Sequence, residues 1–184
     1  MTKLGTVLLT TMLVSACGTQ TPLAPAAPAI PAPQPYATLA QMMRGIPFPA
    51  SNIIFDTQSE DPGAAKKATE GARGATASFS SVYGGWQAVE NNALAIAETA
   101  NLLTIPGRMC ANGKPVPVQS ADWQRFVQGL RDAGMASYKA AQTKDMDKML
   151  DAADTLTNAC SECHDVYREK SEQRGGDAAR CTAQ

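Results

Sequence analysis

The residues best suited to chemistry lie near the C-terminus, where the chain reads NACSECHDVYRE over residues 158–169. Cys160 and Cys163 are three positions apart, and the residue after them, His164, is the only histidine in the sequence. Two thiols and an imidazole at this spacing serve three kinds of site, namely a dithiol redox pair, part of a zinc site, or the covalent attachment of haem. Each alternative places a different demand on the surrounding sequence.

The sequence context favours haem. A redox Cys-x-x-Cys pair usually lies at a helix N-terminus, where the helix dipole lowers the pKa of the attacking thiol, but Cys160 lies well inside a segment with helical periodicity. A tetrahedral zinc site needs four ligands, and no second histidine is available. Covalent haem needs two thiols for thioether bonds and an imidazole for the iron. We therefore predict one covalently attached haem c, held by Cys160, Cys163 and His164.

Three segments carry apolar residues at spacings of three and four, as expected of amphipathic helices: residues 86–103, 123–141 and 146–167. Pro106 and Gly107 should end the first helix, and Ser120 is the expected N-cap of the second. The third should end before Gly175 and Gly176. It carries the two cysteines and His164 on its apolar stripe, so the motif is expected to face the core.

The first part of the domain is less regular. Residues 36–46 predict about three helical turns, ended by Pro47 and Pro49. Residues 51–56 form a short apolar run that we expect to cap one end of the core, and residues 61–83 predict one helix or an irregular crossover. The fold class is therefore all-α, most simply an antiparallel four-helix bundle with the motif on its last helix.

The N-terminus predicts export and lipidation. Lys3 precedes an apolar stretch over residues 4–16, which is shorter than the about 20 residues that a membrane-spanning helix needs. Residues 1–17 therefore predict a signal peptide. Its VSAC ending is similar to a bacterial lipobox, in which Cys17 is diacylated. The same resemblance implies the outer membrane of a Gram-negative cell, because Gly18 stands where aspartate would signal retention in the inner membrane. An ordinary signal peptide with a nearby cysteine is the alternative.

Composition sets the remaining boundaries. Residues 18–35 are rich in proline and alanine and carry no charge, so we expect an extended linker, with the domain over residues 36–184. The chain has 16 basic and 17 acidic residues, which offers no basic face for nucleic acid.

With Cys17 assigned to lipid and two cysteines to haem, Cys110 and Cys181 remain, and in an oxidising compartment we predict a disulfide between them.

The motif and its place in the chain resemble the class II cytochromes c, the group of cytochrome c′ and cytochrome c-556. The likeness is strongest at CSECHDVYR and extends to LAQMMRGIPFPASNIIF, covering roughly Tyr36 to Gly175, whereas GRMCANGKPVPV looks like an added loop. The resemblance implies that His164 is the proximal iron ligand. It also implies that Arg168 lies near the haem edge, beside a propionate.

The same resemblance bears on the sixth iron ligand, because this family divides into open sites that bind NO or CO and sites closed by a methionine of the first helix. Aligning MMRGI to that helix favours Met43, with Met42 as the alternative. The competing interpretation is that both methionines only pack in the core. Met109, in a loop, and Met135, on another helix, are weaker candidates. Met146 and Met149 are excluded, because they share the helix of His164 at a distance of more than about 15 Å along its axis and cannot reach the other side of the haem ring.

These observations predict a one-electron carrier of the cell envelope, tethered to the membrane by its N-terminal lipid and facing the periplasm. Its partners would be redox proteins of the envelope, and a homodimer stays open. We expect no enzymatic activity, because the single histidine is already assigned to iron. The alternatives are a five-coordinate protein that binds NO or CO, and a lipoprotein whose helices serve interaction or haem-dependent sensing.

Overall fold

The computed structural model describes residues 31–64 and 84–168. Residues up to Ala32 and residues from Pro33 onward form two separate units, and the second is described here. Its helices are α1 (Leu39–Gly45), α2 (Pro47–Phe55), the 3-10 helix η1 (Asp56–Gln58), α5 (Gly85–Leu102), α6 (Ala121–Thr143) and α7 (Met146–Tyr167). The described ranges contain no β-strand, so the predicted all-α class is confirmed for this part of the chain.

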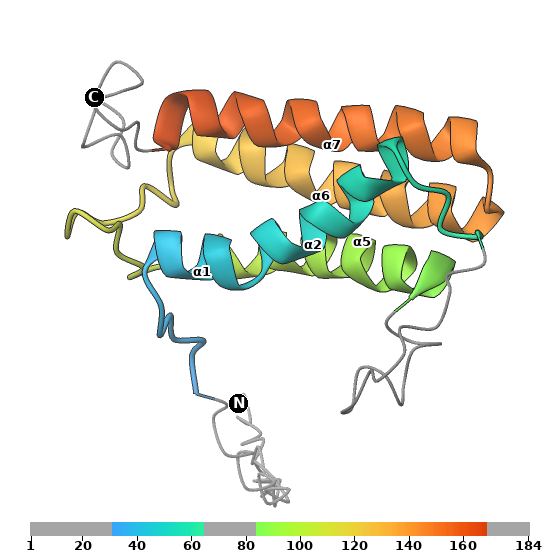
Figure 1. Cartoon of the computed structure of the whole chain (residues 1–184). Coiled ribbons are helices and arrows are strands. Elements are labelled where there is room, and N and C mark those ends of the chain that lie inside the picture. Colours follow the sequence, from blue (N-terminus) through green and yellow to red (C-terminus); the bar gives the residue numbers. More distant parts are fainter. Residues whose placement is uncertain (1–30, 65–83, 169–184) are drawn as a thin grey trace, which may run out of the picture. The chain divides into compact units, whose positions relative to one another are not determined.

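The three long helices form where apolar residues recur at helical spacing. Helix α6 lies between α5 and α7 in the order of contacts, and α2 packs against α5 (Figure 1). Each helix sends its apolar stripe into a common core, whose fully buried side chains include Ile54, Ile96, Trp123, Met149 and Leu156. Leu150 of α7 is an exception, because its side chain is exposed. None of these helices is long and apolar enough to cross a membrane within the described ranges.

Small side chains let α5 and α6 approach each other closely. A Cβ atom added to Gly134 of α6 would lie 2.7 Å from the main-chain nitrogen of Ala97 and 3.1 Å from the carbonyl oxygen of Ala93 on α5. Such a contact is shorter than a real Cβ atom tolerates, so only glycine fits here. The missing side chain of Gly134 therefore permits the short distance between these two helices.

The prediction that Pro47 and Pro49 break the first helical segment was only half right. Helix α1 ends at Gly45, but Pro47 is the first residue of α2, and the helix continues to Phe55. Both prolines lie in the first turn of α2. Main-chain N–H groups have no acceptor within the helix at these positions, so a proline, which has no N–H group, removes no helical hydrogen bond there. The apolar run over residues 51–56 is consequently not an end cap: it is helical, and Ile54 is fully buried.

The ends of the helices are closed by specific groups. Thr38 caps α1 in a reciprocal arrangement, with its hydroxyl accepting from the Gln41 amide and its own amide donating to the Gln41 side chain. Ser120 is the N-cap residue of α6, as predicted, although its hydroxyl donates to the Pro117 carbonyl. Only Lys144 and Asp145 separate α6 from α7. Residues 65–83 and the expected stop at Gly175–Gly176 lie outside the described residues.

Candidate functional site

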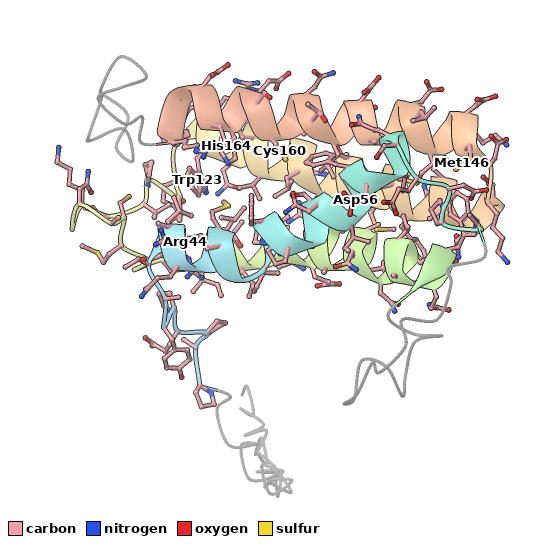
Figure 2. All side chains as sticks on the ribbon, in the orientation of Figure 1. Arg44, Asp56, Trp123, Met146, Cys160 and His164 are labelled. Atoms are coloured by element: carbon pink, nitrogen blue, oxygen red, sulfur yellow. The ribbon has the colours of Figure 1, made fainter. Side chains whose placement is uncertain are left out.

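A cavity of about 540 Å³ lies among α1, α2, α5, α6 and α7, a size typical of small-molecule and cofactor sites. Figure 2 shows His164, Cys160 and Trp123 at one end of the helices, while Met146 lies at the other. Most of the cavity wall is apolar, and its apolar side chains include Leu39, Phe48, Phe55, Ile96, Leu103, Trp123, Phe126, Val127 and Leu130. The space is therefore suited to a largely apolar group.

The Cys-x-x-Cys-His motif forms one wall of this cavity. Cys160, Cys163 and His164 lie in the last two turns of α7, and their spacing turns all three side chains to the cavity. Both cysteines are free thiols and half-buried. Burial raises the pKa of Cys160 to about 11 and that of Cys163 to about 12. At neutral pH the thiols are thus protonated, which is unlike the activated thiol of a dithiol redox centre.

His164 lies in an environment that keeps it neutral. Its pKa is lowered first by burial and then by the positive charge of Arg168, four residues further along the chain. The neutral imidazole is the form that binds a metal. The electrostatics of the site are therefore compatible with an axial ligand at this position.

Helix α1 contributes a methionine to the same cavity. Met43 lines the cavity and is half-buried, whereas Met42 is only 5% exposed and lies in the core without lining it. Of the methionines in the described ranges, Met43 is the one that lines the cavity. The structure thus brings Met43 to the three motif residues and leaves Met42 outside their site.

Two arginines lie where the cavity meets solvent. Arg168, predicted from the family resemblance, lines the cavity at the end of α7, and Arg44 of α1 lines it as well. Both arginines are exposed to solvent. Sequence reasoning missed Arg44, although its position directly after Met43 was an available signal. A site with cations at its open edge can accept the carboxylates of a bound group.

Two aromatic residues of the wall are fixed by hydrogen bonds. The indole nitrogen of Trp123 donates to the carbonyl oxygen of Leu103 at 3.1 Å, and the ring of Tyr167 lies edge-on to it at a centroid distance of 5.0 Å. Both residues are buried. They also line the cavity, which the sequence pattern did not indicate.

The other predicted cysteines lie elsewhere. Cys110 is buried in the loop between α5 and α6 and is disulfide-bonded, but Cys181 lies outside the described residues, so their pairing stays a prediction. Cys17 also lies outside them. Residues 31–64 and 84–168 contain no group of three or more His, Cys, Asp and Glu side chains arranged to hold a metal ion by themselves.

Comparison with protein-family models, with curated proteins and with solved structures found no match to this chain. The site is therefore judged from its own residues. Two neutral thiols, one neutral imidazole, a thioether and two cations surround one largely apolar cavity. This donor set fits a covalently attached haem, because it offers two sulfur atoms for attachment, ligands for iron and positive charge for carboxylates.

Proposed function

We propose that this protein binds one haem c through Cys160 and Cys163 and serves as a one-electron carrier. The observation that carries the proposal is the cavity, which receives both thiols and His164 from α7 and Met43 from α1. His164 would be the proximal iron ligand and Met43 the sixth ligand. When bound, the haem iron supplies the change of valence, and the protein contributes the ligands, the apolar surroundings and the orientation.

The residues of the wall have separate tasks in this function. The apolar side chains limit the access of water, and a drier site shifts the reduction potential of a haem. A methionine sixth ligand raises that potential relative to a second histidine. Arg168, together with Arg44, would hold the propionates where the cavity opens to solvent. No part of this role requires an acid, base or nucleophile, so we propose a carrier and not an enzyme.

We also propose that the helices form an antiparallel four-helix bundle of the class II cytochrome c type, in which α1 and α2 together act as the first helix. The two-residue connection between α6 and α7 supports this topology, because short connections join antiparallel neighbours. A kinked first helix is compatible with the family resemblance, since α1 would carry the sixth ligand while α2 covers the cavity.

The proposed setting is the cell envelope. Cys17 would carry the lipid, residues 18–35 would separate the membrane from the domain, and the haem-bearing domain would face the periplasm and exchange electrons with redox proteins there. The support is the sequence of the leader and linker.

Visible absorption spectra of the full-length protein, produced in cells that attach haem c, test the function. We expect haem to stay with the polypeptide after denaturation, and to be lost from the Cys160→Ala, Cys163→Ala double variant. The oxidised protein should show the weak long-wavelength band typical of methionine-bound haem, and the reduced protein sharp α and β bands. A broad high-spin spectrum that shifts on adding CO would instead favour the gas-binding alternative. Denatured protein without haem would refute the proposal.

A further inference from the structure

The loop between α5 and α6, residues 103–120, is joined to the start of α1. The guanidinium of Arg108 donates through Nη1 to the carbonyl oxygen of Ala37 at 2.8 Å. The amide of Leu39 donates to the carbonyl oxygen of Met109 at 2.8 Å. Leu39 is the first residue of α1 and its amide has no acceptor inside the helix. Two neighbouring loop residues therefore hold the chain on both sides of the N-cap of α1.

The same arginine is also joined to α5. Its Nη2 atom donates to the carbonyl oxygen of Leu102, the last residue of that helix, at 3.1 Å. The C-terminal end of a helix attracts a cation, and its last carbonyls need donors from elsewhere. Arg108 thus forms a bridge from the end of α5 to the start of α1.

Arg108 is an unusual residue to bury. It is only 5% exposed, and its acceptors among the described residues are these two main-chain carbonyls, with Nε left unbonded. Burial lowers the pKa of its guanidinium, and removing a cation from water is costly unless its hydrogen bonds compensate. An apolar residue would fill the same space without the free-energy cost of burying a charge. What only arginine provides here is the pair of hydrogen bonds that joins α5 to α1.

The loop is firm enough to act as an anchor. The amide of Val116 donates to the carbonyl of Arg108 at 2.9 Å, and the amide of Cys110 donates to the carbonyl of Lys114 at 2.8 Å. The side chains of Val116 and Val118 are buried in the core, and Cys110 is disulfide-bonded. A segment closed by its own hydrogen bonds and buried side chains can transmit a fixed position to the helix it holds.

Helix α1 depends on such external support. It has seven residues, too few for a stable helix on its own, yet it presents Met43 to the cavity. We propose that Arg108 is a positioning residue, which fixes α1 against the end of α5 and thereby keeps the sulfur of Met43 at the cavity that His164 lines. This inference rests on the proposed haem function, and it gives the added loop a role in setting the sixth ligand.

Hydrogen exchange and absorption spectra of the full-length haem-loaded protein test the inference with three variants. Arg108→Met keeps the length of the side chain and removes both hydrogen bonds, whereas Arg108→Lys keeps the charge but not the planar fork that spans two carbonyls. The control is Arg131→Met on α6, because Arg131 also makes two side-chain hydrogen bonds but does not line the cavity.

In Arg108→Met we expect the amide of Leu39 to exchange at least about tenfold faster, as loss of roughly one hydrogen bond implies. The methionine band should weaken and CO binding should appear, while exchange in the middle of α6 stays unchanged. Arg108→Lys should also speed exchange at Leu39 and weaken the methionine band. Arg131→Met should change neither the exchange at Leu39 nor the band. If Arg108→Met does not fold, Arg108→Lys carries the comparison.

Unchanged exchange at Leu39 and an unchanged methionine band in both Arg108 variants would overturn the inference. Faster exchange at Leu39 with a full methionine band would overturn it as well, because α1 would then not need the bridge to place Met43. Failure of the haem proposal would look different, since the wild-type protein itself would lack haem or the methionine band.

Discussion

The hydroxyl group of Tyr167 donates a 2.6 Å hydrogen bond to Oδ2 of Asp122, which joins the last residue of α7 to the first turn of α6. Tyr167 follows His164 by three residues, so this bond holds the turn of α7 that carries the proposed iron ligand. The main-chain amide of Trp123 donates to the other oxygen of the same carboxylate at 2.9 Å. Asp122 thus connects the motif helix to a wall of the cavity.

Tyr167→Phe should lower the melting temperature by a few degrees at pH 7, because it removes this hydrogen bond and retains the buried ring. The bond from Tyr167, followed by one from Ser120, lowers the pKa of Asp122. Stabilisation by a lowered carboxyl pKa is complete above the unfolded value of about 4 and is lost as the pH falls through the folded value. Denaturation of both proteins at pH 7 and pH 3 should therefore show a difference that shrinks in acid. An equal difference at both pH values would contradict the assignment.

Met42→Ala and Met43→Ala form a matched pair. Met42 is buried in the core, so its truncation should lower the free energy of unfolding by about 2–5 kcal/mol while the methionine band of the haem persists. Met43 lines the cavity and is less buried, so its truncation should cost less stability but remove the band and permit CO binding. Urea denaturation and absorption spectra of the two variants check this. Loss of the band in Met42→Ala alone would reverse the assignment.

Gly134→Ala should destabilise the protein, because the new methyl group would lie 2.7 Å from the main-chain nitrogen of Ala97. Relieving such an overlap by moving two packed helices typically costs about 1–3 kcal/mol. Gly129→Ala on the same helix is the control, since no atom lies within 4 Å of the added Cβ. That variant should gain up to about 1 kcal/mol from the higher helix propensity of alanine. Urea denaturation that ranked the two variants in the opposite order would refute the close approach of α5 and α6.

Pro47→Ala should change the free energy of unfolding by less than about 1 kcal/mol. Pro47 begins α2, where it interrupts no hydrogen bond of the helix. Ile53→Pro, in the interior of α2, serves as the comparison and should cost about 3 kcal/mol or more, because it removes a helical hydrogen bond. Circular dichroism during urea denaturation measures both changes. A large gain of helix in Pro47→Ala would show that the proline separates α1 from α2.

The sequence was sufficient to predict the three long helices and the side on which the Cys-x-x-Cys-His motif lies. The reason is local: apolar residues at spacings of three and four form one face of a helix, and that face must be buried. Local reasoning was wrong about Pro47, which was expected only to end a helix. A proline can end one helix or begin the next, and the neighbouring residues do not distinguish the two cases. Whether a second helix forms after the proline depends on whether the following segment can pack against another part of the protein, and α2 packs against α5.

The side chains that share the cavity with the motif were decided only by the tertiary structure. Met42 and Met43 are neighbours with the same chemistry, and the rotation of α1 about its axis determines which of them reaches the cavity. That rotation depends on contacts distant in sequence, such as those of Arg108 with Ala37 and Leu102. The sequence by itself determined the haem attachment that we propose, because its two thiols and its imidazole lie within about one turn of a single helix and need no distant residue to bring them together. The tertiary structure decided what faces that motif, because this requires α1, the loop over residues 103–120 and α5 to meet.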